Sequence, residues 1–339
     1  MISELYLSKF GPLNDIKWDN LKNINIMVGK NSTGKTIALK ALYASLKSLE
    51  EQGMGNDNRL LKEILSDKLY WTFQPGDIGL GALVNTESNG PLKFNMKEDN
   101  RSFGFVFGKD TKKSVNKVDS DFEFPRKMNS VFIPANEVIS RYQIILKSRE
   151  QDRVFGFDET EYSLVKIMQF PSSTDLDGMS EDIAERLRNF DGGFLNYTKD
   201  DNVWKFINGK NELPIGILSE GVRKMSVVER LLATNYIKPG SIVIIDEIEN
   251  SLHPQALRDF IDIIYLLSLN EVQFFISTHS YIALKLFYLL ARKKEISISV
   301  VSIEEDEIRC ADLKDGLPEN DIIKESNKIY EEEVDLMFG

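Results

Sequence analysis

The stretch GKNSTGKT, residues 29–36, matches the pattern G-x-x-x-x-G-K-[ST] at each of its fixed positions. It follows an apolar run, INIMV at 24–28, and precedes residues 36–52, where leucines recur at helical spacing. A loop between a strand and a helix presents backbone N–H groups and a helix N-terminus to an anion. The sequence therefore predicts a phosphate-binding loop made of Gly29, Lys30, Asn31, Ser32, Thr33, Gly34, Lys35 and Thr36.

Four residues of this loop have distinct chemical tasks. Gly29 and Gly34 let the backbone turn around a phosphate without a side-chain collision. Lys35 is expected to neutralise charge on the β- and γ-phosphates, and Thr36 to offer its hydroxyl to a magnesium ion. These tasks predict ATP and Mg²⁺ as the cofactors.

Acidic residues and a histidine follow two later apolar runs. The segment IVIIDEIEN, 242–250, places Asp246 and Glu247 at the end of a predicted strand, and STHS, 277–280, places His279 after the next one. Ligands of open α/β sheets bind at this strand end. Asp246 is suited to the Mg²⁺ shell, Glu247 to polarising the attacking water and His279 to contacting the γ-phosphate or orienting that water. Glu249 is interpreted as a surface or loop residue.

The alternation of elements predicts an α/β core with a parallel sheet. The C-terminal part contains predicted helices at 219–237, 254–268 and 280–293 and predicted strands at 241–245, 272–276 and 296–303. Antiparallel hairpins are predicted within 71–133 and at 192–209, the latter with its turn near 199–202, and helices within 138–169 and 181–190. The expected division is a discontinuous core (1–50 and 205–315), an inserted β-hairpin and helical lobe (51–204) and an acidic amphipathic tail (316–339).

The composition excludes several classes of site. The 339 residues include one cysteine, Cys310, and two histidines, so the chain has no internal disulfide and no cysteine- or histidine-rich metal centre. The first ten residues do not resemble a secretion signal, and no apolar run approaches 18 residues. We therefore expect a cytoplasmic protein that does not enter a membrane.

The net charge of −11 is unevenly distributed. The residues after position 303 include 13 acidic and 4 basic side chains, which leaves the rest of the chain almost neutral. A neutral body disfavours extensive nucleic-acid binding. The basic residues within 109–127 are interrupted by acidic ones, so a solvated charged loop is favoured there, and a local DNA-binding patch stays open.

The stretch LSEGVRK, 218–224, has two interpretations that are compatible with each other. Ser219 suits the N-cap of a helix, and the N-terminus of that helix is also an anion site. The chain order of phosphate loop, LSEG, IIDE and STHS resembles that of ABC-type ATPases, with 27 residues from Ser219 to Asp246 and 33 from there to His279. The segment before the phosphate loop, and LHP at 252–254, are similar to the soluble branch that includes SMC, RecF and OLD-type proteins.

This resemblance implies a P-loop ATPase fold with a mixed core sheet, an antiparallel β lobe and a helical insertion. It also implies a homodimer that encloses two ATP molecules, in which the signature Ser219, Glu220 and Gly221 of one copy faces the nucleotide of the other. Val222 stands where the signature usually has glutamine. The glutamine expected after the strand near 130–134 is also absent, and either Asn136 or Glu137 takes its place.

The chain is similar to stand-alone ATPases of bacterial anti-phage systems such as Septu and PARIS. That resemblance implies an ATP-hydrolysing sensor or scaffold that controls a separate toxin or nuclease. Two alternatives stay open: a RecF-like ATPase that clamps DNA directly, and a nucleotide-gated scaffold with little turnover. The tail is expected to form a helix whose main role is packing on the core, with partner docking as the alternative; its apolar face comprises Ile322, Ile323, Ser326, Ile329, Tyr330 and Val334.

Overall fold

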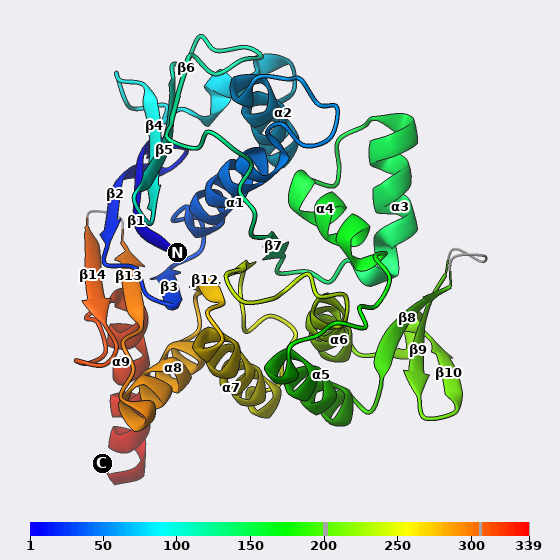
Figure 1. Ribbon diagram of the computed structural model, residues 1–339. Coiled ribbons are helices and arrows are strands. Elements are labelled where there is room, and N and C mark those ends of the chain that lie inside the picture. Colours follow the sequence, from blue (N-terminus) through cyan, green and yellow to red (C-terminus); the bar gives the residue numbers. More distant parts are fainter. Residues whose placement is uncertain (199–202, 305–306, 339) are drawn as a thin grey trace.

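A six-stranded sheet forms the centre of the computed structural model, which describes residues 1–198, 203–304 and 307–338 (Figure 1). Its strand order is β14-β13-β3-β12-β11-β7, and all neighbours are parallel except the edge strand β14. The bounds are β3 Ile24–Gly29, β7 Ser130–Ile133, β11 Ile242–Ile245, β12 Gln273–Thr278, β13 Ser299–Ile303 and β14 Ile308–Asp312. The predicted parallel α/β core is therefore confirmed.

Helices cover both faces of this sheet because its strands are apolar on both sides. On one face, Met27, Phe132 and Phe275 pack with the helices α1 (Lys35–Glu51) and α2 (Leu61–Phe73) and with a second, five-stranded sheet. The opposite face, with Ile26 and Ile276, packs against the remaining long helices of the domain. Those helices are α4 Glu159–Met168, α5 Gly178–Asp191, α6 Glu220–Ala233, α7 Pro254–Leu269 and α8 Tyr281–Lys294.

A second, antiparallel sheet lies over α1 and has the strand order β2-β1-β4-β5-β6 (Figure 1). Its strands are β1 Ile2–Phe10, β2 Leu13–Asp19, β4 Leu92–Glu98, β5 Arg101–Phe107 and β6 Lys117–Ser120. The expected hairpins within 71–133 are present. They do not form a sheet of their own, because β4 pairs with β1 of the N-terminal hairpin β1–β2. In addition, β7, from the predicted insert, pairs with β11 in the core sheet. Whether 51–204 is a separate folding unit stays a prediction.

The predicted helical region within 138–169 is interrupted. It contains the short helix α3 (Tyr142–Lys147), a π-turn at Ser148–Asp152 and then α4, which begins with an N-cap and capping box at Asp158. The predicted hairpin follows as β8 (Phe194–Thr198) and β9 (Val203–Asn208), to which β10 (Asn211–Pro214) adds a third strand. The predicted turn at 199–202 lies outside the described residues.

The tail forms one continuous helix, α9 (Asp321–Phe338), which extends past α8 to the C-terminal end (Figure 1). The expectation that its apolar face packs on the core is only partly correct. Ile322 and Ile323 pack there, whereas Ile329 and Tyr330 are 59% and 66% exposed. The periodic pattern predicts the helix correctly but cannot show what covers its face. Within the described parts of the chain, no helix has the length and apolarity that crossing a bilayer requires.

Candidate active site

The phosphate loop connects the end of β3 with the start of α1, as the sequence predicts. Gly34 lies just before the helix with a φ of +95°, and a Cβ at this position would meet the Leu13 side chain at 2.6 Å. The loop therefore requires glycine here. Lys35 Nζ donates to the carbonyl oxygens of Gly29 (2.7 Å) and Lys30 (2.6 Å), so the ammonium group lies folded across the loop. Burial lowers the pKa of Lys35, against the opposing influence of nearby carboxylates.

Asp246 meets the phosphate loop directly. The Thr36 hydroxyl lies 3.0 and 2.9 Å from the two Asp246 carboxylate oxygens, and Ser277 Oγ donates to Oδ1 at 2.5 Å. Asp246 is 6% exposed, and it follows β11, which lies between β12 and the edge strand β7 in the core sheet. Two segments more than 200 residues apart in the sequence therefore bring a hydroxyl and a carboxylate together beside the phosphate loop.

Glu247, Glu249 and His279 form a second cluster at the C-terminal ends of β11 and β12. His279 Nδ1 lies 3.2 Å from Glu249 Oε1 and 3.9 Å from Glu247 Oε1. Glu249 also accepts hydrogen bonds from the Thr278 hydroxyl (2.8 Å) and the His279 N–H (2.9 Å). Glu249 lies in the turn after β11, as its interpretation as a loop residue expects, and its carboxylate, 14% exposed, holds the end of β12. Glu247 is one-third exposed and has a left-handed backbone, with a φ of +45°.

The start of α6 packs against the loop that carries these residues. Ser219 is the N-cap, and its Oγ accepts the Val222 N–H at 3.3 Å. Glu220 Oε2 accepts a hydrogen bond from the Ser251 hydroxyl (2.6 Å), and a Cβ on Gly221 would lie 2.8 Å from the Ser251 carbonyl oxygen. The N-cap interpretation of Ser219 agrees with the structure. Among the described residues, its hydroxyl has no hydrogen bond to the phosphate loop of the same chain.

Lys224 connects this helix to the acidic loop. Its Nζ is buried and donates to the backbone carbonyl oxygens of Glu247 (3.1 Å), Asn250 (3.4 Å) and, more distantly, Ile248 (3.5 Å). Burial lowers the pKa of Lys224 to about 8, although three neighbouring carboxylates act in the opposite direction. The ammonium group therefore fixes the backbone that positions the Glu247 side chain.

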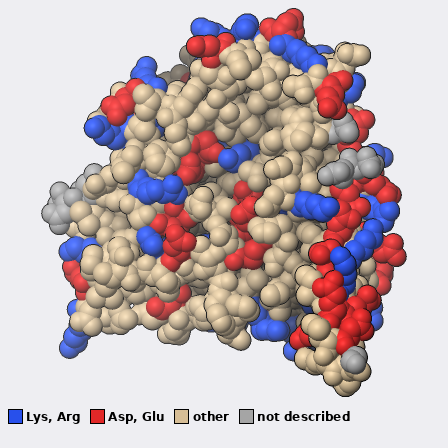
Figure 2. Space-filling view, turned by 180° about the vertical axis from the view of Figure 1, so that it is seen from behind, with Lys and Arg blue, Asp and Glu red and all other residues tan. Residues whose placement is uncertain are grey.

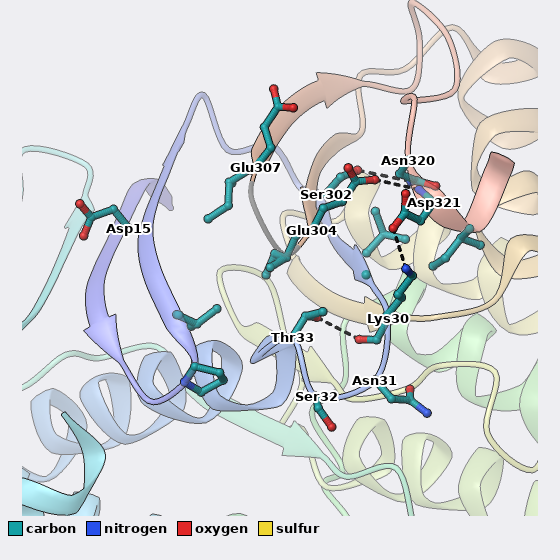
Figure 3. A pocket seen from close by; sticks show the side chains of 17 residues that line it. Asp15, Lys30, Asn31, Ser32, Thr33, Ser302, Glu304, Glu307, Asn320 and Asp321 are labelled. Atoms are coloured by element: carbon teal, nitrogen blue, oxygen red, sulfur yellow. Dashed lines mark hydrogen bonds and ion pairs between the residues drawn. The ribbon is translucent and has the colours of Figure 1, made fainter. Parts of the chain in front are cut away.

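A cavity of about 680 Å³ lies beside the phosphate loop, next to residues 29–33 (Figure 3). The turn between β1 and β2, the end of β13 and the start of α9 contribute its remaining walls. Lys30 of the loop forms an ion pair of 2.8 Å with Asp321, the first residue of α9. Asp15, Glu304 and Glu307 also line the cavity, which therefore offers carboxylate oxygens as hydrogen-bond acceptors (Figure 3).

Comparison with known proteins places this geometry in a family. Residues 24–285, more than half of the chain, match the family model described as "AAA domain, putative AbiEii toxin, Type IV TA system". The chain belongs to this family. An uncharacterised protein of Methanocaldococcus jannaschii is 27% identical over 175 residues, which are 48% of this chain and 78% of that protein.

Solved structures of SMC heads share the fold of this family member. The SMC head bound to the C-winged helix domain of ScpA superposes with a TM-score of 0.53 at 16% identity, covering 92% of this chain and 97% of that one. The Smc head with an extended coiled coil, bound to the C-terminal domain of ScpA from Pyrococcus furiosus, gives 0.52 at 14% identity, with 98% of both chains covered. The predicted fold, a P-loop ATPase of the ABC and SMC type, is confirmed.

The residues at the phosphate loop fit the magnesium ion that this ATPase fold implies. Thr36 and Asp246 supply a hydroxyl and a carboxylate, the hard oxygen ligands that Mg²⁺ takes. Within the described residues, no cluster of three or more acidic, histidine or cysteine side chains is arranged as a metal site. Mg²⁺ in nucleotide sites is commonly held by one or two protein oxygens, nucleotide phosphates and water. Such an ion would neutralise charge on the phosphates during their transfer.

The two candidates for the missing glutamine differ in their surroundings. Glu137 forms an ion pair of 2.9 Å with Arg223 of α6 and also binds Ser140. Its carboxylate therefore ties the loop after β7 to α6. Asn136 is exposed, and both residues stay candidates for a contact with the ion or its water.

Two elements of the site escaped the sequence analysis, although one of them had a recognisable signal. Lys224 precedes Val227, Val228 and Leu231 on the buried face of α6, so a lysine occupies an apolar helical stripe. A charge in that position indicates a buried partner. Glu249 had no such signal, because its contacts with residues 278 and 279 arise only when β11 and β12 pair.

Replacing Lys224 by methionine tests its role in positioning. We expect kcat to fall about tenfold with little change in ATP affinity, because a small displacement of a catalytic group is enough to slow a reaction. Phosphate release and nucleotide titration measure the two effects, and Lys224→Arg should recover part of the rate. A loss of affinity equal to the loss of kcat would contradict this role.

The pH dependence of stability gives an independent readout for the same variant. The folded-state pKa of Lys224, about 8, lies below the ordinary lysine value of 10.5, so the unfolded chain binds more protons between these values. The wild type should therefore gain stability as the pH rises from 8 to 10.5. Lys224→Met should lack this gain, which urea unfolding at several pH values would detect.

Proposed function

We propose that the chain hydrolyses ATP with the help of Mg²⁺, in a homodimer that encloses the nucleotide, and thereby controls a separate effector protein. The observation that carries this proposal is the contact between Thr36 and Asp246, at 2.9 and 3.0 Å, beside the Glu247 and His279 cluster. The arrangement supplies a phosphate cradle, hard oxygen ligands and a carboxylate base at one sheet edge.

Each residue has a defined task in this proposal. The backbone of the phosphate loop and Lys35 bind the β- and γ-phosphates, and the neighbouring cavity of about 680 Å³ suits a nucleoside in size. Carboxylates of that cavity accept hydrogen bonds from ribose hydroxyls or the amino group of the base. The Glu247 carboxylate accepts the proton of the attacking water. Glu249 orients the His279 ring through Nδ1, which leaves Nε2 for the γ-phosphate or the water.

The second copy completes the site in the proposed dimer. The N-terminus of α6 offers the Ser219 hydroxyl and the Gly221 N–H to an anion, and among the described residues the Ser219 hydroxyl has no hydrogen bond to the phosphate loop of its own chain. A two-fold arrangement would place this helix N-terminus against the γ-phosphate held by the partner. Lys224 and Glu220 tie the start of α6 to the loop after β11, which carries Glu247. A nucleotide bound by one copy would contact α6 of the second copy, and this contact would reach the Glu247 loop of that second copy.

The proposal of a separate effector has support from the family. The family description includes a putative toxin of a type IV toxin–antitoxin system, which favours a role next to a partner in defence against phage. The DNA-clamp alternative receives less support from the basic residues within 109–127. Arg126 is buried in ion pairs with Glu50 and Glu98, and Lys117 pairs with Asp119.

Light scattering with and without nucleotide tests the proposed assembly. Addition of Mg²⁺ and a non-hydrolysable β,γ-imido analogue of ATP should at least double the weight-average mass of the full chain. ADP should have a smaller effect, because it lacks the γ-phosphate that the partner's α6 would bind. An identical mass with and without the analogue would rule out the enclosed dimer.

A further inference from the structure

The C-terminal half of α9 has an apolar face that no other described part of the chain covers. Ile329 and Tyr330 recur seven residues later as Leu336 and Met337, and these four side chains are 59%, 66%, 88% and 68% exposed. The stripe continues the one that begins at Ile322, where the helix packs on the core. In Figure 2 this helix projects at the lower right, with dense red along its length. A face that is packed at one end and bare at the other indicates an absent partner.

Acidic residues border this apolar face. Glu331, Glu332 and Asp335 lie outside the apolar stripe in the helical projection, whereas the exposed Glu333 lies within it, one helical turn from Ile329 and from Met337. None of the three forms an ion pair with a described residue. The exposed half of α9 is therefore an apolar strip that carries negative charge on its flanks and at Glu333, and an apolar surface bordered by positive charges would complement it.

The chain itself contains such a surface. A groove of about 330 Å³ lies where α5, α7 and α8 meet. Apolar side chains that include Leu286 and the 44% exposed Leu289 line it. Four cations border it: Arg186, Arg258, Lys293 and Lys294. None of these four pairs with a carboxylate among the described residues; Lys294 lies over the Tyr265 ring, 5.4 Å from its centroid. Asp262 is the acidic residue of the lining.

We propose that this groove binds the exposed half of α9 from a second copy of the chain. The two surfaces match in chemistry: an apolar strip with acidic flanks and one acidic residue within it, Glu333, meets an apolar floor bordered by four cations. Opposite charges across an interface select the partner and fix its register. An amphipathic helix in an apolar groove is a common mode of recognition.

The helix cannot occupy the groove of its own chain as it stands. α9 is continuous over eighteen residues, and its first residue is tied to the phosphate loop through the Asp321–Lys30 ion pair of 2.8 Å. Its C-terminal half is exposed and therefore lies outside that groove. Because α8 both borders the groove and contacts α9, a two-fold axis beside α8 would let two copies exchange their helices. In such an exchange, α9 of each copy binds the groove of the other copy, and the assembly ends at two chains.

Charge reversal in nucleotide-free protein tests the exchange. The full-length wild type should be a dimer by light scattering without ATP. Lys293→Glu with Lys294→Glu reverses the groove, and Glu331→Lys with Glu332→Lys reverses the helix. Either variant alone should raise the dimer dissociation constant by about a hundredfold, because like charges then face each other. Lys113→Glu with Lys127→Glu, two exposed residues elsewhere, is the matched control and should remain dimeric.

Mixing the two reversed chains makes the test specific. In a mixed pair each acidic element meets a basic one, so the mixture should regain the dimer that both variants have lost. A wild type that stays monomeric, a groove variant that stays dimeric, or a mixture that stays monomeric would overturn the proposal. A monomer that binds a different protein through α9 would do the same.

The exchange does not rest on ATP-driven assembly. Ser219→Arg, designed to block the enclosed nucleotide dimer, should leave the nucleotide-free dimer intact. The α9-reversed variant should still gain mass with the ATP analogue. Failure of one assembly is therefore distinguishable from failure of the other.

Discussion

Glu247→Gln is expected to lower the rate of ATP hydrolysis by about a thousandfold, within the range that a positioned general base contributes. Glutamine has nearly the same shape but cannot accept the proton of the attacking water. ATP affinity should change little, because the phosphate loop and Lys35 are untouched. Phosphate release under saturating ATP measures the rate, and Glu185→Gln, an exposed substitution on α5, serves as the control.

The same variant should reveal the ATP-bound assembly. Binding then continues while breakdown is blocked, so hydrolysable ATP should increase the mass of Glu247→Gln as much as the imido analogue increases that of the wild type. A turnover within threefold of the wild type would remove Glu247 from the role of base. If the variant is inactive but its mass does not respond to ATP, Glu247 would keep the role of base, and the enclosed dimer would be contradicted.

The phosphate loop and the strand-end acid were predictable because each is encoded by a short continuous segment. GKNSTGKT carries its own geometry, since Gly34 supplies the left-handed backbone and Lys35 and Thr36 open the helix. Asp246 follows a four-residue apolar strand whose end can be located from the sequence alone. Because β3 and β11 are parallel strands of one sheet, their C-terminal ends place both segments on the same side of the sheet.

Contacts that depend on packing were not predictable in the same way. The interaction of Lys224 with the carbonyl oxygens after Asp246 needs the orientation of α6 relative to β11, which no local pattern states. The edge strands β2 and β14 also escaped detection, because LNDIKWD and IRCAD lack a regular apolar alternation. Amphipathicity located α9 but left its docking surface undefined.

Ser219→Arg is expected to abolish hydrolysis while ATP binding to the phosphate loop persists. Arginine would fill the space in front of the α6 N-terminus, where the partner's γ-phosphate is proposed to lie. Within its own chain the change removes one N-cap hydrogen bond, that to the Val222 N–H, at a cost of about 1 kcal/mol. Ser219→Thr keeps the capping hydroxyl and should retain most activity. A loss of ATP binding in the arginine variant would place Ser219 in the site of its own chain.

Complementation between two inactive chains provides the decisive measurement for Ser219. Lys35→Ala removes the ammonium group from the phosphate loop but keeps the α6 N-terminus, whereas Ser219→Arg does the reverse. In an equimolar mixture, half of the dimers would be mixed, and each would contain one complete site. Activity should therefore recover to at most about a quarter of the wild-type rate if Ser219 acts across a two-fold interface. If Ser219 instead served the nucleotide of its own chain, every site in the mixture would carry a defect, and the activity would stay at the level of the separate variants.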